Sequence, residues 1–163
     1  MHGYGVYENF IHRVSELEET VLHLYMSEVL NQKKKFKILF IDDDEFFLDL
    51  YSQKAKRYDV EMKIAHNAQE ALYKLENGFS PDMIIVDLDM PVMDGFSFID
   101  VIQEKNLAPQ SAITILTNKN EPYYVEKARH HHIDLYIVKA TQLPSQVMDS
   151  VISLLTKRLQ KAQ

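Results

Sequence analysis

Five short apolar runs recur between residues 36 and 138, and polar segments separate them. The runs are Phe36–Ile41, Val60–His66, Met83–Val86, Ala112–Leu116 and Leu135–Val138. The third run is apolar throughout, which is typical of a strand buried on both faces of a parallel sheet. The second run alternates between apolar and polar residues and therefore predicts a strand with one exposed face.

Capping and stop signals divide the intervening sequence into helices. Asp44 stands at an expected N-cap, Asn67 followed by Glu70 resembles a capping box, and Pro122 suits a first helical turn. The predicted helices run from Glu45 to about Tyr58, Asn67 to about Asn77, Phe96 to about Asn106, from a cap at Asn120 or Glu121 to about His131, and onward from Pro144. Strands that alternate with helices predict an α/β fold built on a five-stranded parallel sheet.

The first 35 residues follow a different pattern. From Val6 to about Asn31 there is no Pro or Gly, and apolar residues recur at spacings of three and four, which predicts one amphipathic helix. We therefore expect an N-terminal helical extension over residues 1–35 and a second domain over residues 36–163. The run Lys33–Lys35 is interpreted as the solvated joint between them.

A heptad pattern within this helix predicts a coiled-coil homodimer. Position a holds Tyr7, Val14 and Val21, and position d holds Phe10, Leu17 and Leu24. Branched residues at a with Leu at d favour a parallel two-stranded coil. The stripe is widened by Ile11, Leu22, Tyr25 and Val29, which leaves open a single helix folded back on its own domain.

Composition narrows the class of protein. Of 163 residues, 46% are apolar and 26% are charged, which fits a soluble globular chain, and the net charge of −6 argues against direct nucleic-acid binding. The chain has no cysteine and no apolar run near 18 residues. We therefore expect a cytoplasmic protein without disulfides and without a membrane span.

Four of the predicted strands end in residues suited to one chemistry. These residues are Asp42 and Asp43, Asp87, Thr117, and Lys139. Parallel strands bring their carboxyl ends to one edge of the sheet, where Mg²⁺ would offset the crowded carboxylates. Asp43 and Asp87 could hold the metal with the backbone carbonyl of Asp89. Asp87 could then serve as a nucleophile in phosphoryl transfer, while Thr117 and Lys139 grip the phosphoryl oxygens.

Residues 36 to about 158 resemble a receiver domain of a two-component response regulator, related to the stand-alone chemotaxis regulator. The matching motifs are Ile-Asp-Asp-Asp at 41–44, Asp-Leu-Asp-Met-Pro-Val-Met-Asp-Gly at 87–95, Ile-Leu-Thr at 115–117 and Tyr-Ile-Val-Lys at 136–139. The separations between their key residues also fit the family without gaps.

The resemblance implies a phosphoacceptor signalling protein rather than an enzyme. Asp87 would receive a phosphoryl group from a sensor histidine kinase or phosphotransfer protein. Asp42 and Asp43 would form the Mg²⁺-binding acidic pair, and Thr117 and Tyr136 would form a switch pair. The fold would be a doubly wound, flavodoxin-like sheet of order 2-1-3-4-5. Partners would meet the face made by residues 121–131, 135–138 and 144–160.

The sequence departs from the family pattern at several positions. Ala140 stands where the family has a proline after the lysine, so we expect a trans Lys139–Ala140 bond with Lys139 still reaching the site. Asp89 and Lys119 occupy positions that influence water access, and we expect them to face each other and slow hydrolysis. The run His130–His132 is expected to be an exposed helix end, because adjacent helical residues point in different directions.

Two rival functions are considered. A degenerate receiver could act as a dimeric binding scaffold without phosphorylation. Asp87-Leu88-Asp89 after an apolar strand also resembles the nucleophile motif of haloacid-dehalogenase-like phosphatases, but there the paired acids come later in the chain. A phosphoaccepting receiver that signals through protein contact accounts for more of the strand-end residues.

Overall fold

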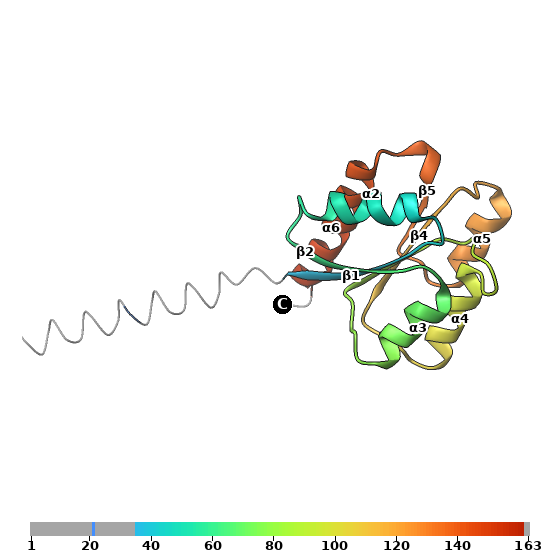
Figure 1. Cartoon of the computed structure of the whole chain (residues 1–163), viewed down its shortest axis with the longest axis horizontal. Helices are drawn as coiled ribbons and strands as arrows, with labels where there is room; N and C mark the ends of the chain where they lie inside the picture. The colour runs from blue at the N-terminus through green and yellow to red at the C-terminus, as the bar shows by residue number, and fades with distance from the viewer. Residues whose placement is uncertain (1–20, 22–34, 162–163) are drawn as a thin grey trace, which may run out of the picture. The chain divides into compact units, whose positions relative to one another are not determined.

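The computed structural model describes Val21 and residues 35–161 (Figure 1). The chain divides into two units, Met1–Lys34 and Lys35–Gln163. The predicted N-terminal amphipathic helix and its coiled coil fall, apart from Val21, outside the described residues. The strands of the second unit are β1 (Phe36–Ile41), β2 (Val60–Ala65), β3 (Met83–Val86), β4 (Ala112–Thr117) and β5 (Leu135–Val138). Its helices are α2 (Glu45–Ala55), α3 (Ala68–Glu76), α4 (Gly95–Glu104), α5 (Pro122–His130) and α6 (Pro144–Lys161), with a short 3₁₀ helix η1 (Lys139–Thr141).

The five strands form one parallel sheet, as the sequence pattern predicted, in the order β2-β1-β3-β4-β5 that the resemblance to receiver domains implied. The register places Ile41 of β1 beside Val86 of β3, and Val86 beside Ile115 of β4. Thr117 at the end of β4 pairs with Val138 at the end of β5. The residues that follow these strands therefore gather at one edge of the sheet.

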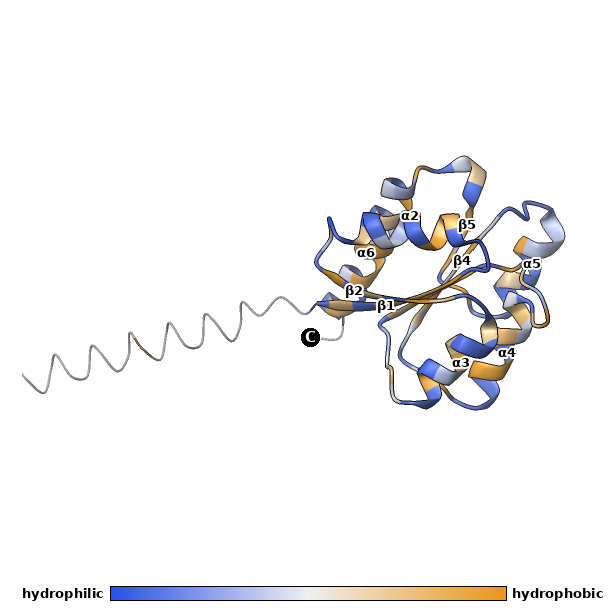
Figure 2. Cartoon of the chain, in the orientation of Figure 1, coloured by the Kyte–Doolittle hydropathy of each residue, from blue (hydrophilic) through white to orange (hydrophobic). Residues whose placement is uncertain are grey.

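Helices cover both faces of the sheet and enclose two apolar layers (Figures 1 and 2). On one face α2 and α6 pack on Ile38, Phe40 and Ile85, which are almost completely buried. On the other face α3, α4 and α5 pack on Leu39 and its neighbours in β3 and β4. Figure 2 shows apolar residues concentrated on the strands and on the helix faces turned toward them.

The predicted caps Asp44 and Asn67 form side-chain capping hydrogen bonds, whereas Glu121 stands at the N-cap of α5 without one. The Asp44 side chain accepts a hydrogen bond from the Phe46 N–H at 2.9 Å. The Asn67 side chain accepts from the Glu70 N–H at 2.8 Å, and the Glu70 carboxylate accepts in turn from the N–H of His66, one residue before the cap. These contacts satisfy N–H groups that a helix start leaves without partners.

Two local predictions differ from the structure. Helix α2 ends at Ala55, three residues before the expected end at Tyr58, whose hydroxyl instead donates to Asp149 of α6 at 2.7 Å. The residues after β5 form η1, which the sequence analysis did not predict. Three residues are too few to show a helical period.

Helix α5 is held less deeply than the other helices on its face of the sheet. Its full length lies in the described part of the chain, and Ala128 is its one buried residue, whereas α4 buries five. None of the helices within residues 35–161 combines the length and the apolar character that a membrane span requires.

Candidate functional site at the carboxyl edge of the sheet

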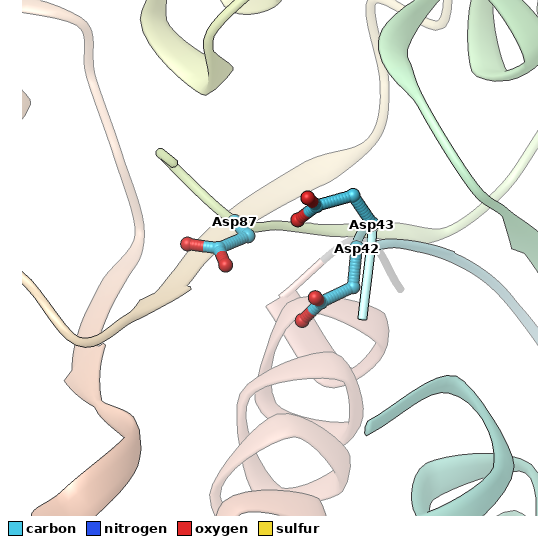
Figure 3. Close-up of side chains that lie close together, drawn as sticks. All are labelled: Asp42, Asp43 and Asp87. Atoms are coloured by element: carbon cyan, nitrogen blue, oxygen red, sulfur yellow. The ribbon is translucent and has the colours of Figure 1, made fainter. Parts of the chain in front are cut away.

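Three carboxylates meet at the edge where β1 and β3 end (Figure 3). Asp42 and Asp43 follow β1 directly, and Asp87 follows β3. One oxygen from each carboxylate lies within 4.8 Å of the others. Asp42 and Asp87 are 1% and 6% exposed, whereas Asp43 is exposed to solvent. Like charges this close repel, so the cluster needs a compensating cation.

Asp42 has an unusual environment for a carboxylate. Burial raises its pKa to about 6, although contacts with Lys139 and the Asp44 N–H oppose that rise. Its buried Oδ2 atom lies 2.7 Å from Lys139 Nζ, yet within the described residues it has no partner in hydrogen-bond geometry. A buried oxygen with spare acceptor capacity beside two further carboxylates fits the oxygen ligands that a Mg²⁺ ion takes. The predicted Asp cluster is therefore present and could hold a metal.

Lys139 joins the acidic residues from the opposite side. Its Nζ lies 2.7 Å from Oδ2 of Asp42 and 2.7 Å from Oδ2 of Asp87, and its side chain is 3% exposed. Burial alone lowers the pKa of Lys139, but the two carboxylates outweigh burial and raise it. No peptide bond among residues 35–161 is cis, so the predictions of a trans Lys139–Ala140 bond and of a lysine that reaches the site are confirmed.

Thr117 and Tyr136 lie on the same face of the sheet. Thr117 pairs with Val138 and Ile115 with Tyr136, so the two residues of interest stand two positions apart on neighbouring strands. Thr117 is completely buried. The Tyr136 hydroxyl donates to the Lys119 carbonyl at 2.8 Å, and burial, with smaller effects of nearby acidic groups and Tyr124, raises its pKa to about 12.

Asp89 and Lys119 face each other at the rim of the site, as predicted. Lys119 Nζ lies 3.1 Å from Asp89 Oδ2, and this contact raises the pKa of Lys119. The Asp89 N–H donates to Asp87 Oδ1 at 3.2 Å. Asp89 thus links the acidic cluster to the loop after β4. The expected role of the Asp89 carbonyl as a metal ligand stays a prediction.

Gly95 allows the loop after β3 to fold back onto Asp87. Its N–H donates to the Leu88 carbonyl at 3.1 Å, and Asp94 before it caps α4 by accepting from the Ser97 N–H. A Cβ atom at Gly95 would lie 2.3 Å from the Asp87 carbonyl oxygen. This position therefore requires glycine because of close approach.

The prediction of three exposed histidines is wrong for His131. Its side chain is only 15% exposed, with Nε2 at 3.0 Å from Asp100 of α4 and Nδ1 at 2.8 Å from the Lys127 carbonyl. His130 is exposed, and His132 is exposed with a φ of 54°, the left-handed region that favours glycine. Helix packing brings residues 100 and 131 together, and helical periodicity within one segment does not reveal that contact.

Phe47 is a further residue of the site, and the sequence pattern did not indicate it. Its ring lies under Lys139, with Nζ 4.2 Å from the ring centroid. Phe47 stands in the first turn of α2, five residues after Asp42, and its aromatic character was the available signal. An apolar residue at this point reads as core, because nothing in the sequence indicates that a cation lies over it.

Comparisons with known proteins agree with the fold. The sequence matches the response regulator receiver domain family over residues 38–151. It is 30% identical to the chemotaxis protein CheY of Halobacterium salinarum over 122 residues, which cover 74% of this chain and 97% of that protein. It is also 30% identical to the two-component response regulator ARR10 of Arabidopsis thaliana over 118 residues, 71% of this chain. There the chain spans about a fifth of the relative's length (21%).

Solved structures show the same architecture. A CheY-like response regulator receiver domain protein from Methanospirillum hungatei superposes with a TM-score of 0.70 at 23% identity, covering 78% of this chain and 99% of that one. The chemotaxis protein CheY4 of Vibrio cholerae gives a TM-score of 0.67 at 24% identity, covering 73% and 98%. Together with the family match, the strand order and the acidic cluster, these findings show that the chain belongs to the response regulator receiver domain family of two-component systems.

Proposed function

We propose that this protein is a phosphoaccepting response regulator in which Asp87 takes a phosphoryl group from the phosphohistidine of a sensor kinase. The observation that carries the proposal is the Lys139 ammonium, which bridges Asp42 and Asp87 at 2.7 Å each at the end of β3. A degenerate receiver would have no need for this buried arrangement of charges, since each buried charge is costly without a partner.

The residues divide the work of phosphoryl transfer. One Asp87 oxygen forms a bond to phosphorus while the bond from phosphorus to the donor histidine nitrogen breaks, and the imidazole keeps that electron pair. Lys139 and the Thr117 hydroxyl then contact the phosphoryl oxygens that carry the developing charge. Asp42, Asp43 and Asp87 would hold Mg²⁺, which supplies positive charge to the same oxygens.

Signalling would follow from a shift between two conformations. The phosphoryl group favours the state in which Thr117 and Tyr136 move inward, and this movement alters the face made by α5, β5 and α6. The hydrogen bond from Tyr136 to the Lys119 carbonyl already connects β5 to the loop that leads into α5. A downstream protein would recognise the altered face.

Beryllofluoride, a mimic of the phosphoryl group, tests the proposal directly. With Mg²⁺ present, we expect it to bind at Asp87 and to change amide chemical shifts in the site and on α5, β5 and α6. Without Mg²⁺, or with excess chelator, we expect no change, because three carboxylates repel an anionic ligand. Shift changes confined to α2 and α3 would contradict the proposed output face, and absence of binding would favour the degenerate receiver.

The ion pair between Asp89 and Lys119 should slow loss of the phosphoryl group. We expect Asp89→Ala and Lys119→Ala each to speed dephosphorylation a few-fold, because removal of either side chain opens a path for water. The double variant should dephosphorylate at the same rate as each single variant, because either substitution alone already removes the ion pair. Dephosphorylation is measured after removal of the phosphodonor.

Lys105→Ala is a matched control for this measurement. Lys105 is also a surface lysine in an ion pair, 2.9 Å from Glu76, but it lies at the C-cap of α4. Its loss should leave the dephosphorylation rate unchanged. If the Asp89 and Lys119 variants behave like this control, the ion pair does not shield the phosphoryl group.

We further propose that residues 6–30 dimerise the protein as a parallel coiled coil, with residues 36–163 as an independent receiver. The support is the heptad pattern of the sequence, with Val21 at an a position. A shared coil would bring two receivers into one signalling particle.

Sedimentation tests the dimer. We expect the full chain to sediment as a dimer and a chain beginning at Lys35 to sediment as a monomer, because the apolar heptad positions all precede Lys35. Val21→Glu in the full chain should weaken the dimer, since a charge at position a opposes burial. A monomeric full chain, or a dimer that survives the deletion unchanged, would contradict the coiled coil.

A further inference from the structure

The Lys139 ammonium is held by two kinds of group. Oδ2 atoms of Asp42 and Asp87 lie 2.7 Å from its Nζ. The ring of Phe47 lies beneath it, with the centroid 4.2 Å from Nζ. A cation at this distance from a ring face is attracted to the quadrupole of the ring, and the attraction is stronger where water is excluded. At 3% exposure, the Lys139 side chain meets that condition.

The Phe47 ring is itself fixed in place. Its residue stands in the first turn of α2, and its N–H donates to the carbonyl of the capping residue Asp44 at 3.0 Å. The half-buried side chain packs against the apolar layer beneath α2 and α6. The Phe46 ring contacts it edge-on at 5.5 Å between centroids. These contacts hold the Phe47 ring in position under the Lys139 ammonium before any ligand binds.

The two kinds of contact respond differently to the proposed chemistry. Cation binding by Asp42 and Asp87 would neutralise the carboxylates that hold Lys139, and phosphorylation would convert the Asp87 carboxylate into an acyl phosphate, a mixed anhydride. Both events weaken the pull of the carboxylates on the ammonium, and in the metal-bound site no anionic oxygen replaces that pull until the phosphoryl oxygens reach Lys139. The attraction to Phe47 does not change, because the ring binds neither metal nor phosphoryl group.

The backbone around Lys139 offers few contacts that could fix the ammonium in place of the two carboxylates. Lys139 begins η1, and the following Ala140 is exposed. The turn is closed on its far side by the Thr141 hydroxyl, which donates to the Val138 carbonyl at 2.9 Å. Side-chain contacts therefore determine where Nζ lies.

We propose that Phe47 is a positioning residue that keeps the Lys139 ammonium in the site by cation–π attraction when Asp42 and Asp87 become engaged. The proposal deepens the proposed function, because it concerns the same phosphoryl site. It predicts that loss of the aromatic ring at position 47 lowers the affinity for a phosphoryl mimic and leaves the affinity for Mg²⁺ almost unchanged.

Three variants separate this role from simple packing. Phe47→Leu removes the ring and keeps an apolar side chain, and Phe47→Tyr keeps the ring. Phe36→Leu makes the same change in the same apolar layer at the start of β1, away from the site. We expect Phe47→Leu to weaken beryllofluoride binding in the presence of Mg²⁺ about tenfold, while Phe47→Tyr and Phe36→Leu stay near the parent affinity. Mg²⁺ affinity, measured alone, should change little in all three variants.

A spectroscopic measurement tests the contact without any ligand. Protons above an aromatic face are shifted upfield by its ring current, so the Lys139 ε-methylene signal should lie upfield in the parent protein and in Phe47→Tyr. It should return toward the ordinary lysine position in Phe47→Leu. An ordinary Lys139 signal in the parent protein, or equal beryllofluoride affinities for Phe47→Leu and Phe36→Leu, overturns the proposal. If the parent protein fails to bind beryllofluoride, the proposed function fails, and the ring-current result then decides on the contact alone.

Discussion

Asp87→Asn is expected to abolish phosphorylation by acetyl phosphate or by a cognate kinase. The substitution replaces the attacking carboxylate oxygen with an amide that is a poor nucleophile, and it removes one of the carboxylates that faces the proposed cation. We expect complete loss of labelling, to the background level, and not a partial reduction. Radiolabelled acetyl phosphate followed by mass spectrometry of the labelled peptide makes the measurement.

The matched control is Asp49→Asn, which changes an exposed acid on α2 and should label like the parent protein. Chelation of divalent cations should reduce parent labelling to the level of Asp87→Asn. Labelling of Asp87→Asn at the parent level on another residue would remove Asp87 from its proposed role. Labelling that survives chelation would instead remove the metal from the mechanism.

Gly95→Ala is expected to destabilise the receiver strongly and to impair the site. The added Cβ would lie 2.3 Å from the Asp87 carbonyl oxygen and 3.0 Å from the Leu88 Cα, so backbone atoms must move. Overpacking of this kind costs about 3 kcal/mol, because neither strand end nor helix start can yield cheaply. Urea unfolding followed by circular dichroism measures the loss of stability.

Gly78→Ala is the control that separates a steric clash from the backbone strain of replacing a glycine at positive φ. Gly78 follows Asn77, the C-cap of α3, and has a φ of 88°, with no atom within 4 Å of an added Cβ. Alanine there is strained by about 1–2 kcal/mol, with no effect on Asp87. We expect only Gly95→Ala to weaken beryllofluoride binding, since only that variant displaces the loop carrying Asp87. Equal effects of the two variants on binding would show that Asp87 does not depend on the close approach.

The strands could be predicted from the sequence because polar segments separate five apolar runs, and four of these runs end in residues that meet at the site. The strand order was implied by the resemblance to the receiver family. Met83–Val86 is buried at every position, as an unbroken apolar run implies. Asp42, Asp87 and Lys139 converge because parallel strands share a carboxyl edge, so placing the strands also placed these residues. The trans bond before Ala140 followed from the cost of a cis bond before a residue other than proline.

Contacts between helices were beyond the reach of the sequence pattern. His131 and Asp100 lie 31 positions apart and meet only because α4 and α5 pack side by side. The sequence predicts a helix that runs to about Tyr58, whereas α2 ends at Ala55 and the Tyr58 hydroxyl donates to Asp149 of α6. In both cases the side chain has an apolar body and a polar tip, and the polar tip contacts a residue of another helix that is distant in the sequence.

The position of Phe47 illustrates the same limit within the site. Its place in the chain predicts a core residue, and it does pack on the core. Its contact with Lys139 depends on how η1 directs a lysine 92 positions later. A sequence can indicate which side chains gather at a strand edge more readily than which ring lies under which charge.

The shallow anchoring of α5 has an energetic consequence for the whole molecule. Because Ala128 is its one buried residue, this helix can detach from the sheet at a small fraction of the cost of global unfolding. Strand β3, buried at every position, can open only with the domain. The receiver thus combines a rigid sheet edge, which holds Asp42, Asp43 and Asp87 in place, with helix α5, whose displacement costs far less free energy than unfolding of the domain.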